Sequence, residues 1–160
     1  MNEVPEEADN PEHVAMERPD SVAIVENFWR EVWQQPQNPD AIDRLVHEDF
    51  VITSGGRDIA GREPFKAWVR DFLAKVHDFQ FHIIETFQNH DGSRVASRWR
   101  VTGRNNGLMG TQPNGAPIEM TGTAVWEVGP DGRLRHNWVE RNAFEVHGAI
   151  TRADARANIF

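Results

Sequence analysis

Apolar residues recur at helical spacing in the first half of the chain. The first predicted helix covers residues 21–33, after a possible N-cap at Asp20 or Ser21. A second, shorter helix is predicted from Pro39 to about Asp49. The third covers residues 63–76 and has the most regular apolar stripe: Phe65, Trp68, Val69, Phe72, Leu73 and Val76.

Strand-like segments fill the second half of the chain. A brief strand is predicted over residues 50–53, and four long ones over residues 79–87, 93–103, 118–128 and 134–146. Turn sequences occupy two of the junctions, at residues 89–92 and 129–132, and a Gly- and Asn-rich loop covers residues 104–117. Helices first and antiparallel strands last predict an α+β fold, with three N-terminal helices packed on one curved, mostly antiparallel sheet.

The length of 160 residues fits one domain. We expect this domain to cover residues 21–150. Residues 1–20, rich in Glu and Pro, are expected to form a disordered acidic arm, and residues 151–160 a loose tail.

Composition and charge exclude several classes of function. The net charge of -8 opposes nonspecific binding to nucleic acid, which depends on Lys and Arg near phosphates. No apolar run approaches the roughly 20 residues that span a bilayer, and the first residues lack a secretory signal pattern, so we expect a cytoplasmic protein without membrane contact. There is no Cys, the seven His do not cluster, and no glycine-rich loop opens a helix, so we expect no metal or other cofactor.

Several motifs follow one another in the order typical of one family. They are the strand Trp99–Gly103, the loop Gly107–Gly115, the hairpin Asp131–Leu134 and Trp138 in the last strand. Together with the helix that contains Phe28 to Trp33 and the segment Glu48–Val51, they resemble the SnoaL-like branch of the nuclear transport factor two superfamily. The resemblance covers about residues 21–150.

This resemblance implies a cone-shaped α+β barrel with a pocket between the helices and the concave face of the sheet. It also implies a homodimer through the open face of the sheet, as is common in the family. Relatives include polyketide cyclases, ketosteroid isomerases, limonene epoxide hydrolases and members with no catalysis. The fold therefore does not fix the function, which depends on the site residues.

The last predicted strand carries the main candidate for acid/base chemistry. Alternation places His136, Trp138, Glu140 and Asn142 on one face, which we expect to line the pocket because it carries the large aromatic residue. In an apolar pocket, desolvation would raise the pKa of Glu140 into the range useful for a general acid or base. Limonene epoxide hydrolases have a catalytic acidic residue two positions after the corresponding Trp, and Glu140 matches that position. The alternative is a surface ion pair between Glu140 and a nearby arginine.

Arg98 and His136 are further candidates for catalysis. Arg98 could hold a substrate carboxylate or enolate oxygen, or it could face solvent or a partner subunit. His136 could assist Glu140 or lie at the rim of the pocket. The expected substrate-binding residues, with Asn142 orienting a substrate oxygen, are Trp29, Trp33, Phe50, Thr53, Trp68, Phe72, Trp99, Trp138 and Asn142.

The chain departs from the family at two positions that often carry proton-transfer groups. Relatives often have Asp or His near the position of Thr53, and His near that of Asn105. The leading hypothesis is a cofactor-independent acid/base enzyme that cyclises, isomerises or hydrates a small apolar metabolite of polyketide or terpenoid type, possibly by epoxide opening. The alternative is a non-catalytic small-molecule-binding or dimerisation module of the same fold.

Overall fold

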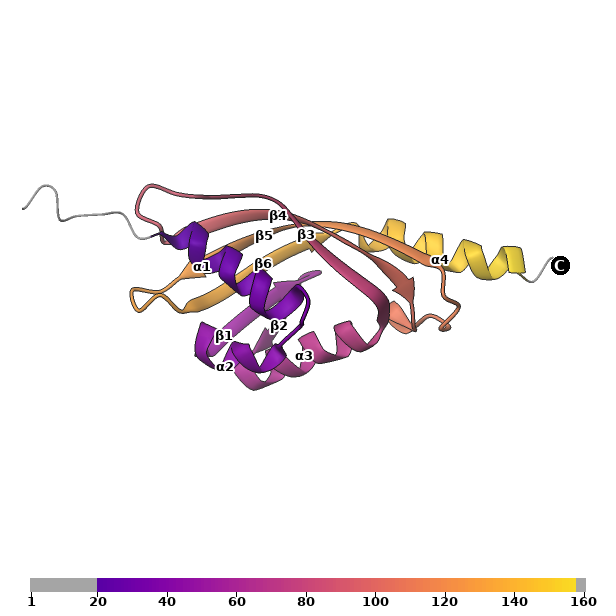
Figure 1. Ribbon diagram of the computed structural model, residues 1–160, viewed down its shortest axis with the longest axis horizontal. Helices are drawn as coiled ribbons and strands as arrows, with labels where there is room; N and C mark the ends of the chain where they lie inside the picture. Colours follow the sequence, from indigo (N-terminus) through magenta and orange to yellow (C-terminus); the bar gives the residue numbers. More distant parts are fainter. Residues whose placement is uncertain (1–19, 158–160) are drawn as a thin grey trace, which may run out of the picture.

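A curved six-stranded sheet organises the structure, and the first three helices cover its concave face (Figure 1). The computed structural model describes residues 20–157, so the predicted acidic arm lies almost entirely outside the described residues. The strands are β1 Val46–Ser54, β2 Arg57–Ala60, β3 Val76–Gln88, β4 Arg94–Asn105, β5 Pro117–Val128 and β6 Leu134–Arg141. They lie in the order β2-β1-β6-β5-β4-β3, and all neighbours are antiparallel except β1 and β6. The predicted α+β fold is confirmed, although β2 and β3 are free edges and the sheet does not close.

The helices follow the predicted order. They are α1 Ser21–Phe28 with a π-helical continuation η2 Trp29–Trp33, the short η3 Pro39–Ala41 and α2 Ile42–Leu45, then α3 Arg62–Ala74, a single turn η4 Leu108–Gly110 and α4 Ala143–Ala157. The Asp20 side chain accepts a hydrogen bond from the Ala23 amide at 3.0 Å, so Asp20, one of the two N-caps expected from the sequence, is the N-cap. No helix within residues 20–157 combines the length and apolar character needed to cross a bilayer.

The C-terminal segment differs from the prediction. The expected strand over residues 134–146 ends at Arg141, and α4 then occupies residues 143–157, where the end of the strand and a loose tail were expected. The helix is rich in Ala, a strong helix former, and buries Val146 and Ile150, which lie four residues apart on one helical face. The Asn114 amide also donates to the Ile150 carbonyl oxygen at 3.2 Å, so a loop far away in sequence holds this helix.

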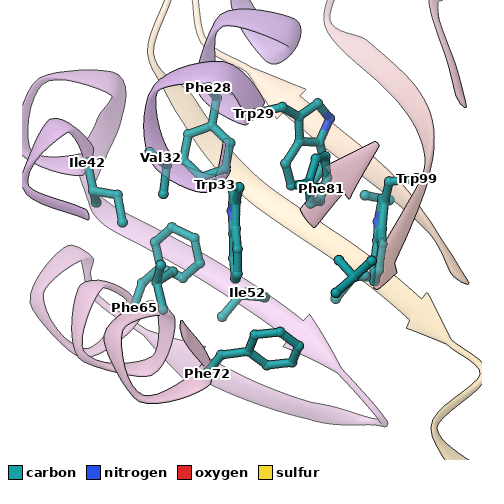
Figure 2. Close-up of a cluster of buried hydrophobic side chains, with 14 of the residues drawn as sticks. Phe28, Trp29, Val32, Trp33, Ile42, Ile52, Phe65, Phe72, Phe81 and Trp99 are labelled. Atoms are coloured by element: carbon teal, nitrogen blue, oxygen red, sulfur yellow. The ribbon is translucent and has the colours of Figure 1, made fainter. Parts of the chain in front are cut away.

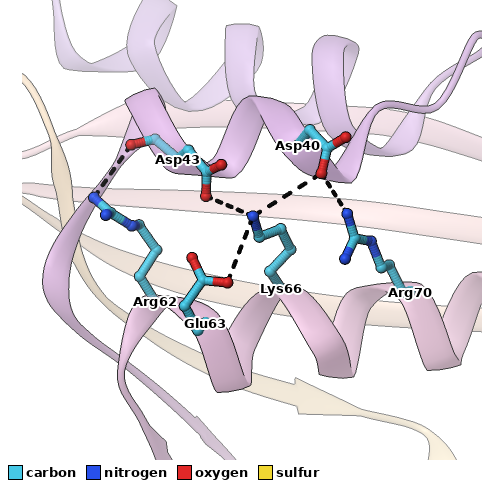
Figure 3. A network of polar contacts seen from close by, with 6 residues as sticks. All are labelled: Asp40, Asp43, Arg62, Glu63, Lys66 and Arg70. Carbon is cyan, nitrogen blue, oxygen red and sulfur yellow. Dashed lines mark hydrogen bonds and ion pairs between the residues drawn. The ribbon is translucent and has the colours of Figure 1, made fainter.

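A charged network joins α3 to the segment 39–45 (Figure 3). Lys66 lies within the otherwise apolar stripe of α3 and is only 7% exposed. Its ammonium nitrogen lies 2.7 Å from a carboxylate oxygen of Asp43, 3.6 Å from Glu63 and 3.9 Å from Asp40, and Arg70 also pairs with Asp40. The hydrogen bond to Asp43 raises the pKa of Lys66 and lowers that of Asp43. The network therefore holds α3 against the segment 39–45.

Candidate functional site

A narrow aromatic cavity lies between the helices and the concave face of the sheet (Figure 2). Its empty space, counted out to the mouth, is about 420 Å³, but a water molecule's centre can range over only about 30 Å³ of it. That is room for about two waters, so a larger guest requires the side chains to move apart. The lining residues are Phe28, Trp29, Trp33, Ile52, Phe65, Trp68, Phe72, Phe81, Trp99, Val101, Trp126, Asn137, Val139 and Arg141.

The indole groups around the cavity differ in their hydrogen bonding. The Trp29 Nε1–H donates to the Ser97 hydroxyl at 2.9 Å, which fixes that ring against the sheet. The indole N–H groups of Trp33, Trp99 and Trp126 are buried and have no hydrogen-bond partner among the described residues. A buried N–H without a partner costs free energy, so a ligand oxygen that accepts from one of them would be stabilised.

Asn137 forms a polar point at the deep end of the cavity. It is 4% exposed and pairs across the sheet with Ile52 on β1 and Trp126 on β5, both of which are almost completely buried. Its side-chain oxygen Oδ1 has no hydrogen-bond partner among the described residues. The deep end therefore offers an unused acceptor.

Arg141 lies at the mouth of the cavity with Trp68 and Phe72. Its guanidinium carbon lies 5.7 Å from the ring centres of both, so the cation rests against two aromatic faces. Burial lowers the pKa of Arg141, and its guanidinium forms no ion pair or hydrogen bond with any described residue. Asp71, which also lies near the mouth, is paired with Lys75 at 2.8 Å. The positive charge at the mouth is therefore not neutralised by an ion pair with any described residue.

The loop after β4 is held against this mouth by Asn105. The loop residues Leu108 and Met109 line a depression that shares Trp68, Phe72 and Arg141 with the cavity. The buried Asn105 side chain donates to the Gln112 carbonyl oxygen at 2.7 Å and accepts from the Leu108 amide at 2.8 Å. The same amide also donates to the Thr111 hydroxyl at 3.0 Å and accepts from the Gly107 amide at 3.2 Å, so both of its polar atoms hold the loop in place.

Five of the predicted substrate-binding residues line the cavity, namely Trp29, Trp33, Trp68, Phe72 and Trp99. Phe50 does not line it. Phe50 is completely buried behind the cavity, with its ring centre 4.5 Å from that of Phe65. It supports the lining from the side of the core.

The prediction that Glu140 lies in the apolar pocket was wrong, and so was the expected inward face of its strand. A β-bulge at Arg135 inserts one residue between the pairs Val128–Leu134 and Glu127–His136. Because one extra residue reverses every later side chain, Asn137 and Arg141 face the cavity instead. Glu140 is exposed in a shallow depression on the outer face of the sheet, which α1 to α3 do not cover, and Trp138 is 37% exposed there.

Arg98 and Asn142 also lie at that outer depression. The Arg98 guanidinium pairs with Glu85 at 2.6 Å, so it does not reach the cavity, and the surface alternative for this residue holds. The Asn142 side-chain oxygen accepts from the Thr121 amide at 2.9 Å and joins the end of β6 to β5. Neither residue is among those that line the aromatic cavity.

His136 and Thr53 come together on the outer face. Thr53 Oγ1 lies 2.8 Å from His136 Nε2 and donates to Asp58 at 2.6 Å, and the His136 ring stacks on Trp138 with centres 3.7 Å apart. Burial lowers the pKa of His136 despite the nearby carboxylate of Asp58. This group is connected to the cavity only through the sheet, so Thr53, Trp138 and His136 are not part of its lining.

The two polar residues that face the cavity, Asn137 and Arg141, were not predicted from the sequence. Val139 lies in phase with both, and its β-branched side chain was the one local sign that this face is internal. Trp126, Phe28 and Phe65 were also missed as lining residues, although their helical or alternating positions marked them as core. No group of three potential ligands among residues 20–157 could hold a metal ion.

Comparisons with known proteins agree with this architecture. The family model for SnoaL-like polyketide cyclases matches residues 23–147. Among solved structures, a candidate SnoaL-like polyketide cyclase from Jannaschia sp. CCS1 has a TM-score of 0.74 and 18% identity, covering 81% of this chain and 90% of that one. A candidate polyketide cyclase from Acidithiobacillus ferrooxidans has a TM-score of 0.71 and 23% identity, covering 86% and 99%. IdmH from Streptomyces antibioticus, also a candidate polyketide cyclase, has a TM-score of 0.69 and 19% identity, covering 82% and 99%. A search of curated proteins finds no match.

Proposed function

Because the chain belongs to the SnoaL-like polyketide cyclase family, we propose that it binds a small, largely apolar organic molecule in the aromatic cavity and folds it for ring closure or isomerisation. The observation that carries this proposal is the lining itself, in which nine of the fourteen residues are aromatic. Aromatic side chains provide large apolar contact area and stack on flat, conjugated molecules. A planar guest with fused rings, or a chain able to form them, fits this lining best.

We expect the site to promote reaction by positioning the reacting atoms of the substrate. No carboxylate or imidazole is among the described residues that line the cavity, so general acid/base catalysis from the wall has no support. Holding a flexible chain with its reacting carbons close together can by itself lower the activation free energy of ring closure by several kcal/mol, about 7–11 kcal/mol in the most favourable cases. The Arg141 guanidinium would stabilise negative charge that develops on a substrate oxygen during enolate formation. The proton lost from the substrate's α-carbon would pass to water or to a basic oxygen of the substrate itself, and a proton would return to the enolate from the same source.

A filled-cavity variant tests binding. The probe is a neutral fused-ring compound, methylnaphthalene, followed by quenching of tryptophan fluorescence. Val139→Phe places extra volume inside the cavity and should abolish binding, whereas Ala67→Phe adds volume on the exposed side of α3 and should leave it unchanged. If the wild-type protein does not bind the probe, or if both variants bind it as the wild type does, the proposal is wrong.

A second function, binding without conversion, is favoured by the lack of a titratable acid or base in the described lining. Incubation with a linear poly-β-ketone thioester separates the two functions. If the wild-type protein accelerates ring formation and Val139→Phe does not, the enzymatic function is supported. Stoichiometric binding without any cyclised product supports the binding protein.

We also propose that the protein forms a homodimer through the outer face of the sheet. Ile84, Phe87, Val125 and Trp138 expose large apolar side chains there, and arginines of β4 pair with glutamates of the two neighbouring strands. Light scattering of the purified protein tests this. Val125→Arg should convert a dimer into a monomer, and a monomeric wild-type protein would contradict the proposal.

A further inference from the structure

We infer that the ligand of the cavity is an elongated aromatic or conjugated acid, with an anionic oxygen at the mouth beside Arg141 and a hydroxyl at the deep end beside Asn137. This inference rests on the proposed function, because it names the chemical class of ligand for the same cavity. It goes further in assigning a polarity and a direction to that ligand.

The mouth favours an anion because of the state of Arg141. A guanidinium remains protonated in proteins, so its charge persists even where water is partly excluded. Trp68 and Phe72 remove water from two sides of it, and no described carboxylate pairs with it. A carboxylate or enolate oxygen would accept the unused N–H donors in a planar, charge-assisted arrangement. The conjugated carbons next to that carboxylate or enolate could pack against the Trp68 and Phe72 rings at the mouth.

The deep end favours a hydroxyl because of two unpaired groups on neighbouring residues. Asn137 Oδ1 is an acceptor without a partner, and the indole N–H of Trp126 is a donor without a partner. Trp126 and Asn137 are directly paired across β5 and β6, and both line the cavity. A hydroxyl donates one hydrogen bond and accepts others, so it can satisfy both groups together.

The spacing of the two polar points sets the direction of the ligand. Asn137 and Arg141 lie on the same face of β6, four residues apart, so their Cα atoms are about 13 Å apart along the strand. Val139 lies between them, and the aromatic residues surround that stretch. A ligand with polar groups at its two ends and an apolar body matches this order, whereas a wholly apolar molecule would leave both ends unsatisfied.

Three probes of the same shape test the inference by fluorescence titration. They are methylnaphthalene, naphthoate, and a hydroxynaphthoate with its hydroxyl at the end of the ring system opposite the carboxylate. In the wild-type protein we expect naphthoate to bind roughly 10- to 100-fold more tightly than methylnaphthalene. The added hydroxyl should tighten binding by a further factor of roughly 3 to 10.

The variants assign each gain to its residue. Arg141→Gln should remove the advantage of naphthoate over methylnaphthalene while leaving the affinity for methylnaphthalene within about threefold of wild type, and Arg141→Lys should retain part of that advantage. Asn137→Leu, a change of similar size, should remove only the gain from the hydroxyl. Circular dichroism confirms that each variant is folded. If Arg141→Gln does not fold, the affinities of naphthoate and methylnaphthalene for the wild type and for Arg141→Lys still show whether the naphthoate advantage depends on Arg141.

The outcomes separate this inference from the proposed function. If methylnaphthalene binds but naphthoate binds no better, or if Arg141→Gln weakens both probes equally, the inference is wrong and the proposed binding function stands. If none of the three probes binds the wild-type protein, both are wrong. A carboxylate advantage that depends on Arg141 supports both.

Discussion

Gly122 on β5 allows Trp99 to pack as it does, and this contact gives a direct test of the cavity wall. A Cβ atom added at Gly122 would lie 2.2 Å from Trp99 Cζ2, 2.5 Å from Cε2 and 2.8 Å from Cη2. Optimal carbon contacts are about 3.5–4.0 Å, so the indole would have to move by about 1 Å or more. Trp99 is 5% exposed and stacks on Phe81 at 5.8 Å, so the free direction is into the cavity.

The variant Gly122→Ala should therefore destabilise the protein. Replacing Gly by Ala within a strand would otherwise stabilise by about 0.5–1 kcal/mol, because Gly loses more backbone freedom on folding. Overpacking in a filled core costs about 1–3 kcal/mol, and the clash involves three ring atoms, so the steric effect should win. The net cost of up to about 2.5 kcal/mol corresponds to a decrease in melting temperature of up to about 10 °C for a domain of this size. Binding of methylnaphthalene should weaken as well, because the displaced indole takes up cavity space.

A double-mutant cycle identifies the cause. Trp99→Phe removes the ring atoms that the new methyl group would meet, so Gly122→Ala should cost much less in that background, with a coupling of about 1–3 kcal/mol. Gly103→Ala is the matched control. Its Cβ would lie 2.4 Å from Val76 Cγ1 and 2.7 Å from the His77 carbonyl oxygen, so Trp99→Phe should not rescue it. Urea unfolding measures each free energy. Equal costs of Gly122→Ala with and without Trp99 would refute the argument.

Four further predictions concern groups away from the apolar lining. Asn105→Ala should destabilise the protein by about 2–4 kcal/mol and speed hydrogen exchange of the loop amides, because several buried hydrogen bonds are lost. The control Asn106→Ala removes one exposed hydrogen bond to the end of α3 and should destabilise the protein less. The raised pKa of Lys66 means that its stabilisation is present below pH 10.5 and is lost as the pH rises through the raised value; Lys66→Met should remove this alkaline loss in urea unfolding. The lowered pKa of Asp43 has the opposite sign, so its stabilisation is present above pH 3.8 and is lost as the pH falls through the lowered value; Asp43→Asn should flatten that acid limb. The pKa of His136 is lowered, so stability should fall as the pH drops below 6.5, and a wild-type profile that is flat there, or unchanged by His136→Gln, would contradict this.

Much of the fold could be predicted from local pattern alone. The helical spacing of Phe65, Val69 and Phe72 reflects the 3.6-residue period that buries one side of α3, and the structure buries those residues. The prediction failed at α4, where Val146 was taken as the end of a strand and residues 151–157 as part of a loose tail. An Ala-rich segment of this kind is helical by propensity, but which surface its apolar side chains contact depends on the distant loop around Asn114.

The aromatic part of the site could also be predicted, because the Trp and Phe residues that line the cavity lie on the apolar faces of their own elements. The polar part could not. Strand alternation gives two faces, and which of them is internal depends on a single bulge at Arg135 and on pairing with β5. That one residue decides that Asn137 and Arg141 face the cavity and that Glu140 faces outward.

By itself, the sequence determined the α+β class, the order of helices and strands and the aromatic character of the interior, because these follow from the period of apolar residues and from propensity. Only the tertiary structure decided which polar groups meet inside. Their meeting depends on strand register, and register is set by contacts between residues far apart in the chain.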